Sequence, residues 1–169
     1  MVGVALRFPV FGRAVVLAAL RLPQGRLRRD FGEWAVREIV LGTFNRRDFD
    51  VLRKFSAPDM EYYPAPEVAA MVDGSYDHQT PVVGPTDAVE FFKGWLAAWG
   101  EFAFVPQEGF DLGEGRVLVL NHIHVQGASS GIELGRQEEA QLYESRGGLV
   151  TRVTQWWSWR QALEDLGLE

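Results

Sequence analysis

The chain has 169 residues, a length that fits one domain, and 47% of them are hydrophobic. It contains no cysteine, which excludes disulfides, thiolate nucleophiles and cysteine-ligated metal sites and fits a reducing cytoplasm. The net charge of −6 is uneven, because residues 1–30 carry about +5 and residues 31–169 about −11. An acidic body argues against a nucleic-acid partner, since phosphates need a basic face.

Residues 1–30 differ in character from the rest of the chain. Their apolar runs are short and are interrupted by Arg7, Arg13 and Arg21, so no membrane span is expected. An arginine-rich, acid-poor start is also typical of targeting segments. We interpret these residues as a loosely ordered or targeting-like extension and expect one domain over residues 31–169.

Apolar residues at helical spacing predict three helices in the first half of the domain. The first stripe contains Val36, Ile39, Val40 and Phe44. The predicted elements are a helix over residues 31–45, a short helix between Asp48 and Pro58, a strand over 60–63, a long loop over 64–84 and a helix over 86–99.

The second half reads as strands separated by glycine-rich turns. Strands are predicted over residues 102–106, 116–126, 132–144 and 149–159, followed by a short helix over 160–166. Helices that precede a run of strands predict an α+β fold, with the helices packed on one face of a curved antiparallel sheet.

Five short strings follow one another along the chain: Phe44–Asp50, Pro58–Glu67, Val89–Phe92 with Trp95 and Trp99, Ser130–Glu133, and Gln161–Glu164 with Gly167-Leu168. Their order and spacing resemble the SnoaL-like branch of the nuclear transport factor 2-like (NTF2-like) superfamily over about residues 33–168. The resemblance implies a cone-shaped fold with a pocket for a small apolar molecule between helices and sheet. It also implies a homodimer formed through the outer face of the sheet.

The superfamily contains ketosteroid isomerases, polyketide cyclases and non-catalytic modules, so the fold alone does not give an activity. Tyr63 stands where the isomerase pattern has its general-base carboxylate, and Val40 stands where it has a tyrosine. The third catalytic position falls near Ala140, beside Glu138 and Glu139. Many relatives carry a histidine where this chain has Gln141. The isomerase mechanism is therefore not expected in that arrangement.

Two pairs of residues remain as candidate catalytic groups. His122 and His124 alternate on one strand, so their side chains share a face. They could bind a metal with Glu138 or Glu139, act in proton transfer, or play a structural part. One of the two adjacent glutamates has to face inward if one side of the sheet is covered, and burial there would raise its pKa. The alternative for the two glutamates is an edge or interface pair matched to Arg136 or Arg152.

The candidate pocket also needs lining residues that combine apolar bodies with polar tips. The side chains expected to line it are Tyr62, Tyr63, Trp95, Trp99, Asn121, Gln141 and Trp157. Plain core packing is the alternative for the aromatic members of this set. Asp77 and His78 in the long loop form a further pair, for which an exposed position is favoured over a place in the site.

Two hypotheses for the function follow. The first is a protein that binds a small apolar molecule, such as a steroid, a polyketide or a terpenoid, without any cofactor or metal. The second is a proton-transfer enzyme of the isomerase, cyclase, dehydratase or hydrolase kind that uses Glu139, Glu138, His122 or His124. A purely structural dimerisation module is a further alternative.

Overall fold

The computed structural model of the chain describes residues 42–72, 79–97, 99–127 and 133–168. The predicted extension over residues 1–30 lies outside the described residues, as do most of the helix predicted over 31–45 and the Asp77-His78 pair.

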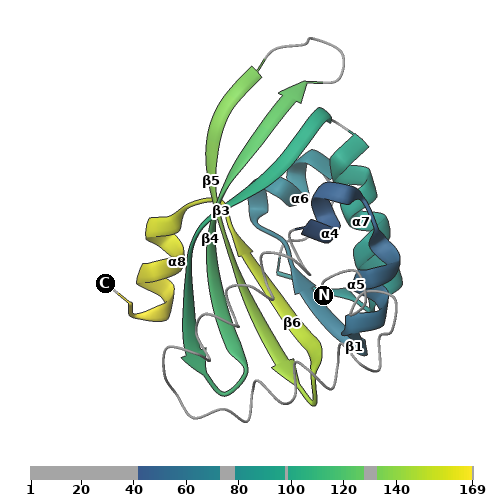
Figure 1. Cartoon of the computed structure of the whole chain (residues 1–169), viewed down its shortest axis with the longest axis vertical. Coiled ribbons are helices and arrows are strands. Elements are labelled where there is room, and N and C mark those ends of the chain that lie inside the picture. The colour runs from purple at the N-terminus through teal and green to yellow at the C-terminus, as the bar shows by residue number, and fades with distance from the viewer. Residues whose placement is uncertain (1–41, 73–78, 98, 128–132, 169) are drawn as a thin grey trace.

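One curved sheet of six strands organises the described part of the chain (Figure 1). The strands are β1 (Ser56–Tyr63), β2 (Val82–Val83), β3 (Trp99–Gly113), β4 (Arg116–Gly127), β5 (Glu133–Arg146) and β6 (Leu149–Trp156). Their order in the sheet is β2-β1-β6-β5-β4-β3. Strands β3 to β6 form an antiparallel meander, whereas β1 pairs with β6 in parallel.

The inner face of the sheet is covered by four helices, α4 (Gly42–Arg46), α5 (Phe49–Phe55), α6 (Pro66–Val72) and α7 (Pro85–Ala97). Helix α7 buries Phe91, Phe92 and Trp95 because these residues recur at helical spacing on one side. The Phe92 ring meets Phe44 of α4 edge-on, with the ring centroids 4.6 Å apart. The main hydrophobic core therefore lies between these helices and the concave side of the sheet.

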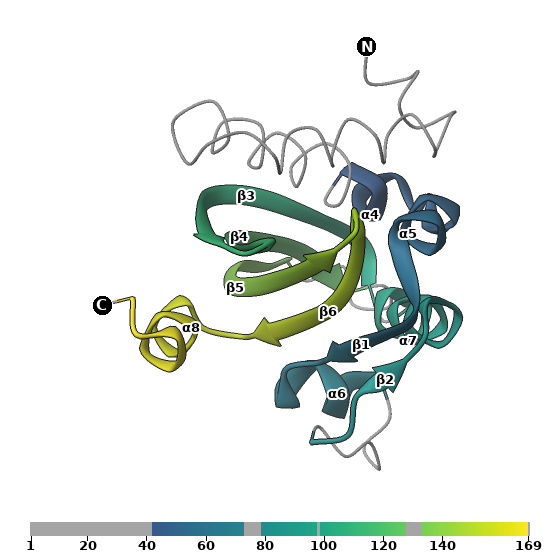
Figure 2. The same cartoon turned by 90° about the horizontal axis from the view of Figure 1, so that it is seen from below.

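The outer face of the sheet carries a second, smaller core beneath helix α8 (Trp159–Leu166), which Figure 2 shows on the opposite side from α4 to α7. Ser158 caps the start of α8 by accepting a hydrogen bond from the Gln161 N–H, and Gly167 ends it in the left-handed conformation. This core contains Leu118, Leu120, Ala140, Leu142 and Ala162.

The α+β class and the curved, mostly antiparallel sheet are thus confirmed, with several differences in detail: β1 begins at Ser56 rather than at residue 60, and Trp99 begins β3 rather than ending a helix. The segment predicted as a loop over residues 64–84 contains α6 and β2, because Pro66 occupies the first turn of a helix, where its missing N–H is tolerated. Strand β3 is longer than predicted and continues through irregularities near Pro106. Trp159 begins α8 rather than ending the last strand. No helix of the described residues is long and apolar enough to cross a membrane.

Candidate functional site

A row of polar side chains lies on the inner face of the sheet, where apolar residues would be the usual occupants. Asn121 of β4, Glu139 and Gln141 of β5, and Gln155 of β6 are all buried. Asn121 is the register partner of Glu139, and Gln155 is the register partner of Gln141. Strand alternation therefore places all four on one face, while the intervening Ala140 points into the core beneath α8.

Glu139 is the centre of this row and is fully buried. Its Oε2 accepts a hydrogen bond of 2.7 Å from Nδ2 of Asn121, and its Oε1 accepts one of 2.9 Å from Nε2 of Gln155. Burial raises the pKa of Glu139 from 4.5 to about 7, against the lowering effect of the Asn121, Gln155 and Gln141 amides. The carboxyl group is therefore able to gain and lose a proton near neutral pH.

Gln155 connects Glu139 to the first strand. Its Oε1 accepts a hydrogen bond of 2.7 Å from the Tyr62 hydroxyl and one of 3.3 Å from the backbone N–H of Ala65. The Tyr62 ring packs against Phe91 and Phe92 of α7. The polar row thus runs without a break from β4 across β5 and β6 to β1.

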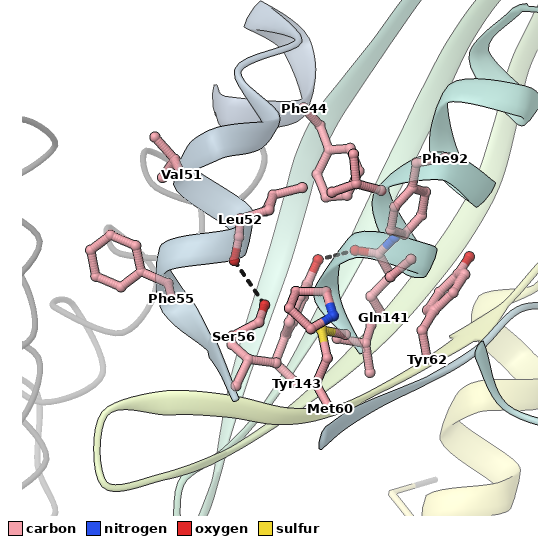
Figure 3. Close-up of a pocket in the computed structure, with 15 residues that line it drawn as sticks. Phe44, Val51, Leu52, Phe55, Ser56, Met60, Tyr62, Phe92, Gln141 and Tyr143 are labelled. Carbon is pink, nitrogen blue, oxygen red and sulfur yellow. Dashed lines mark hydrogen bonds between the residues drawn. The ribbon is translucent and has the colours of Figure 1, made fainter. Parts of the chain in front are cut away.

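Gln141 and Tyr143 form the second part of the row, further along β5. The Tyr143 hydroxyl donates a hydrogen bond to Oε1 of Gln141 (Figure 3). Burial, and after it the charge of Glu139, raise the pKa of Tyr143 well above its ordinary value, so the phenol stays protonated. Nε2 of Gln141 is buried and has no hydrogen-bond partner among the described residues. The Gln141 amide thus lowers the pKa of Glu139 from nearby, although its Nε2 forms no hydrogen bond of good geometry with the carboxylate.

An apolar cavity lies beside Gln141, Tyr143 and Tyr62, as the close-up in Figure 3 shows. Its free volume is about 50 Å³. The cavity is enclosed mainly by side chains from α5, α7, β1 and β6, namely Phe44, Val51, Leu52, Phe55, Ser56, Met60, Pro85, Ala88, Val89, Phe92, Val150 and Val153. A cavity of about 150 Å³ is known to hold benzene, so a ligand with a ring has to displace part of this wall.

Glu139 does not line the cavity itself. Two connections link it to the cavity wall. Gln141, its neighbour on the same face of β5, lines the cavity, and Gln155 hydrogen-bonds both Glu139 and the cavity-lining Tyr62. A ligand in the cavity would therefore meet Gln141 or Tyr62 first, and contact with the Glu139 carboxyl group requires one of these side chains to move.

The other candidate catalytic residues lie on the opposite side of the sheet from Glu139. His122 stacks on the indole of Trp159 at the start of α8, with the ring centroids 4.7 Å apart. Glu138 is exposed and is the register partner of His122. His124 follows on the same outer face and borders an open, polar surface groove. These three residues therefore share a face with one another but not with the buried carboxyl group.

The predicted pocket residues are likewise divided by the structure. Tyr62 and Gln141 line the cavity, while Asn121 is held against Glu139. Trp95 is buried in the core and contacts Trp157, and Trp99 is partly buried at the edge of the same core. Tyr63 points the other way: its hydroxyl bonds the Glu61 carboxylate, and the Arg152 guanidinium lies over its ring.

Sequence reasoning missed two members of the row, Gln155 and Tyr143. A glutamine within a strand is usually exposed, and only the pairing of Gln155 with Gln141 across two strands reveals that both face inward. Within the described ranges, no three histidine, aspartate or glutamate side chains converge on a position that could hold a metal ion.

Comparison with known proteins was informative at the level of structure. No family model and no curated protein matches the sequence. An NTF2-like protein of unknown function from Burkholderia pseudomallei K96243 has a TM-score of 0.62 at 18% identity, over 78% of this chain and 94% of that one. TerC, co-crystallised with polyporic acid, has a TM-score of 0.60 at 20% identity, and the match covers 78% of this chain and 94% of TerC.

IdmH from Streptomyces antibioticus, a proposed polyketide cyclase, gives a TM-score of 0.61 at 16% identity over 78% of this chain and 96% of that one. At identities this low the likeness shows the fold alone. It is the fold of NTF2-like and SnoaL-like proteins.

Proposed function

We propose that this chain, an NTF2-like, SnoaL-like domain by its fold, binds a small and mostly apolar molecule in the cavity between α5, α7 and the sheet. The ligand presents an acceptor oxygen, such as a carbonyl, to Gln141. The fold of the two neighbours described above, one crystallised with polyporic acid and one a proposed polyketide cyclase, supports a ligand of this general kind.

The observation that carries this proposal is Nε2 of Gln141, a buried donor with no hydrogen-bond partner among the described residues. A buried N–H group without a partner destabilises a protein by about 1–3 kcal/mol, so such groups are rare unless they serve a purpose. The Tyr143 hydroxyl occupies Oε1, which leaves Nε2 as the end of the amide that is free to donate. Because Gln141 also lines the cavity, a ligand oxygen placed there would satisfy it.

The cavity has to widen for such a ligand, and α5 is the part of its wall that is best suited to move. Helix α5 has only seven residues, and Asp48 at its N-cap makes no side-chain capping bond. Leu52 of this helix is only partly buried. Met60 of β1 adds an unbranched side chain that can repack around different shapes.

Binding can be tested with two probes of similar shape, acetophenone and ethylbenzene, which differ in the carbonyl group. We expect acetophenone to bind the wild-type protein more tightly, and Gln141→Leu to remove that advantage, about tenfold in Kd for one hydrogen bond. Ethylbenzene should bind both proteins alike. Equal binding of the two probes to the wild-type protein would contradict the role of Gln141.

The site of binding can be tested separately by filling the cavity. Val153→Phe adds a phenyl ring to the wall and should abolish binding of both probes. Val83→Phe is the matched control, because Val83 is exposed on β2 and lies outside the cavity. Polyporic acid can serve as a larger probe in the same titrations. Undiminished binding to Val153→Phe would place the ligand elsewhere.

A second candidate function, proton transfer to and from the bound molecule, is favoured by the buried carboxyl group of Glu139. Once Gln141 or Tyr62 has shifted enough to open the way from the cavity, the ionised Glu139 carboxylate would take a proton from a carbon next to the ligand carbonyl. The ligand would be left as an enolate, whose oxygen accepts the hydrogen bond from Gln141. Return of the proton at the same or another carbon regenerates Glu139, and no further reactant is needed.

Acetophenone also tests this second function, because its methyl protons are acidic. In deuterated water, we expect the wild-type protein to accelerate exchange of these protons for deuterium, as followed by NMR. Glu139→Gln should abolish the acceleration, while Glu138→Gln, which alters the neighbouring exposed carboxylate, should retain it. An equal rate in Glu139→Gln and wild type would exclude Glu139 as the base.

The homodimer expected through the outer face of the sheet stays a prediction. Helix α8 covers part of that face, over Leu118 and Leu142. Val105 is exposed on the part that α8 leaves open, next to His122 in the register of β3 and β4. Sedimentation equilibrium of the wild-type protein and of Val105→Glu would test this interface: we expect the substitution to weaken a dimer.

A further inference from the structure

The side-chain amide of Gln155 makes three hydrogen bonds, each to a different part of the fold. Its Oε1 accepts from the Tyr62 hydroxyl and from the Ala65 backbone N–H, and its Nε2 donates to Oε1 of Glu139. Three different parts of the fold therefore meet at one amide: a cavity-lining tyrosine, the backbone just before α6, and the buried carboxyl group.

These contacts leave the Gln155 amide only one orientation. A backbone N–H can only donate, so the Gln155 atom facing Ala65 must be the acceptor Oε1. Nε2 is then necessarily on the side of Glu139. If the amide were rotated by half a turn, Nε2 of Gln155 would face the Ala65 N–H, and both groups are donors. Oε1 of Gln155 would then face the ionised Glu139 carboxylate, and both groups are acceptors.

Asn121, on the other side of Glu139, is not held in this way. Its Nδ2 donates to Oε2 of Glu139, but its Oδ1 is buried and has no partner among the described residues. Rotation of this amide by half a turn would bring Oδ1 to the carboxyl group, as an acceptor for an O–H proton. Asn121 can thus donate to the ionised Glu139 carboxylate or accept from its protonated form. Gln155 donates to Glu139 in both protonation states.

We propose that Gln155 is the positioning residue of Glu139: it fixes Oε1 as a permanent acceptor and leaves Oε2, on the Asn121 side, as the oxygen that carries the proton. This inference deepens the proposed proton-transfer function and rests on it for its purpose. It also ties the carboxyl group to the cavity wall, since Tyr62 lines the cavity and holds the same amide.

The first test follows the side-chain amide groups by NMR in the full chain, with no ligand present, while Glu139 titrates. We expect the Gln155 Nε2 group to stay hydrogen-bonded on both sides of the midpoint. The Asn121 Nδ2 group should lose its bond to the carboxyl group when Glu139 is protonated. The reverse pattern, or an equal response of the two amides, would overturn the assignment of the proton to Oε2.

The second test measures the midpoint of the Glu139 titration by infrared spectroscopy, with Glu139→Gln identifying the band. Gln155→Met should raise the midpoint by about one pH unit or more, because a donor to the charged form is lost. Tyr62→Phe, which keeps the ring and removes only the hydroxyl group, should raise it by less. Tyr63→Phe, on the other face of β1, is the matched control and should leave it unchanged.

If Gln155→Met fails to fold, the NMR test of the wild-type protein still decides the positioning role, because it needs no variant. Identical midpoints in Tyr62→Phe and wild type would show that the hydroxyl group does not support the amide, and would refute the link between the cavity wall and Glu139. Because none of these measurements uses a ligand or an activity, failure to bind acetophenone would count against the proposed function alone.

Discussion

Burial of Glu139 should make the stability of the protein fall as the pH rises. The folded-state pKa of about 7 exceeds the ordinary value of 4.5, so between these values the folded state holds a proton that the unfolded state has lost. The stability that protonated Glu139 contributes is therefore fully present below pH 4.5. It decreases as the pH rises and is lost once the pH has passed 7. The difference in pKa corresponds to about 3.4 kcal/mol in total, of which about 2.5 kcal/mol falls between pH 5 and pH 8.

Urea unfolding of the wild-type protein and of Glu139→Gln at pH 5 and pH 8 measures this quantity. Other titrating groups affect both proteins alike, so the pH-dependent change in their difference belongs to Glu139. We expect the wild type to lose about 2.5 kcal/mol more than Glu139→Gln over this range. Glu138→Gln, which changes an exposed carboxylate, should follow the wild type. The same pH dependence in Glu139→Gln and wild type would refute a buried, titrating carboxyl group.

Two further expectations concern the frame that holds the site. Gly115 and Gly147 both have positive φ, but a Cβ atom at Gly115 would lie 2.5 Å from the Ser145 carbonyl oxygen, while nothing lies within 4 Å at Gly147. Gly147→Ala should therefore lower the free energy of unfolding by about 1–2 kcal/mol, which is the cost of a positive φ alone. Gly115→Ala should lower it by clearly more, because its Cβ also clashes with Ser145. Equal losses in the two variants would contradict this reasoning. Asn45 holds the backbone N–H and carbonyl of Phe104 with its amide, so Asn45→Ala should destabilise by about 1–3 kcal/mol in thermal unfolding. A loss near zero would mean that water replaces both bonds.

The order of the longer elements could be predicted from the sequence because it depends on local signals, whereas α6 and β2 were missed. Helical spacing identified α7, and glycine turns separated β4, β5 and β6 at nearly the observed limits. The parallel pairing of β1 with β6 could not be predicted, since Tyr62 and Val153 are register partners despite their distance along the chain. Local sequence patterns carry no information on such pairing.

The site was harder to predict because β5 has polar side chains on the face that packs against the helices and apolar side chains on the outer face. Glu139 and Gln141 face the helices, while Ala140 and Leu142 face outward. The usual rule of apolar residues inside and polar residues outside would assign these faces the other way round. The rule fails because α8 covers the outer face around Ala140 and Leu142 and makes this part of it a second core. The sequence therefore identified both glutamates as candidates but could not choose between Glu139 and Glu138.

A crystal structure of the protein with acetophenone would test the central claim most directly. We expect the ligand between α5, α7 and the sheet, with its carbonyl oxygen within hydrogen-bond distance of Nε2 of Gln141 and with Leu52 or Met60 displaced from the positions that close the cavity. A ligand bound only at the surface, or one in the cavity with its carbonyl turned away from Gln141, would contradict the claim.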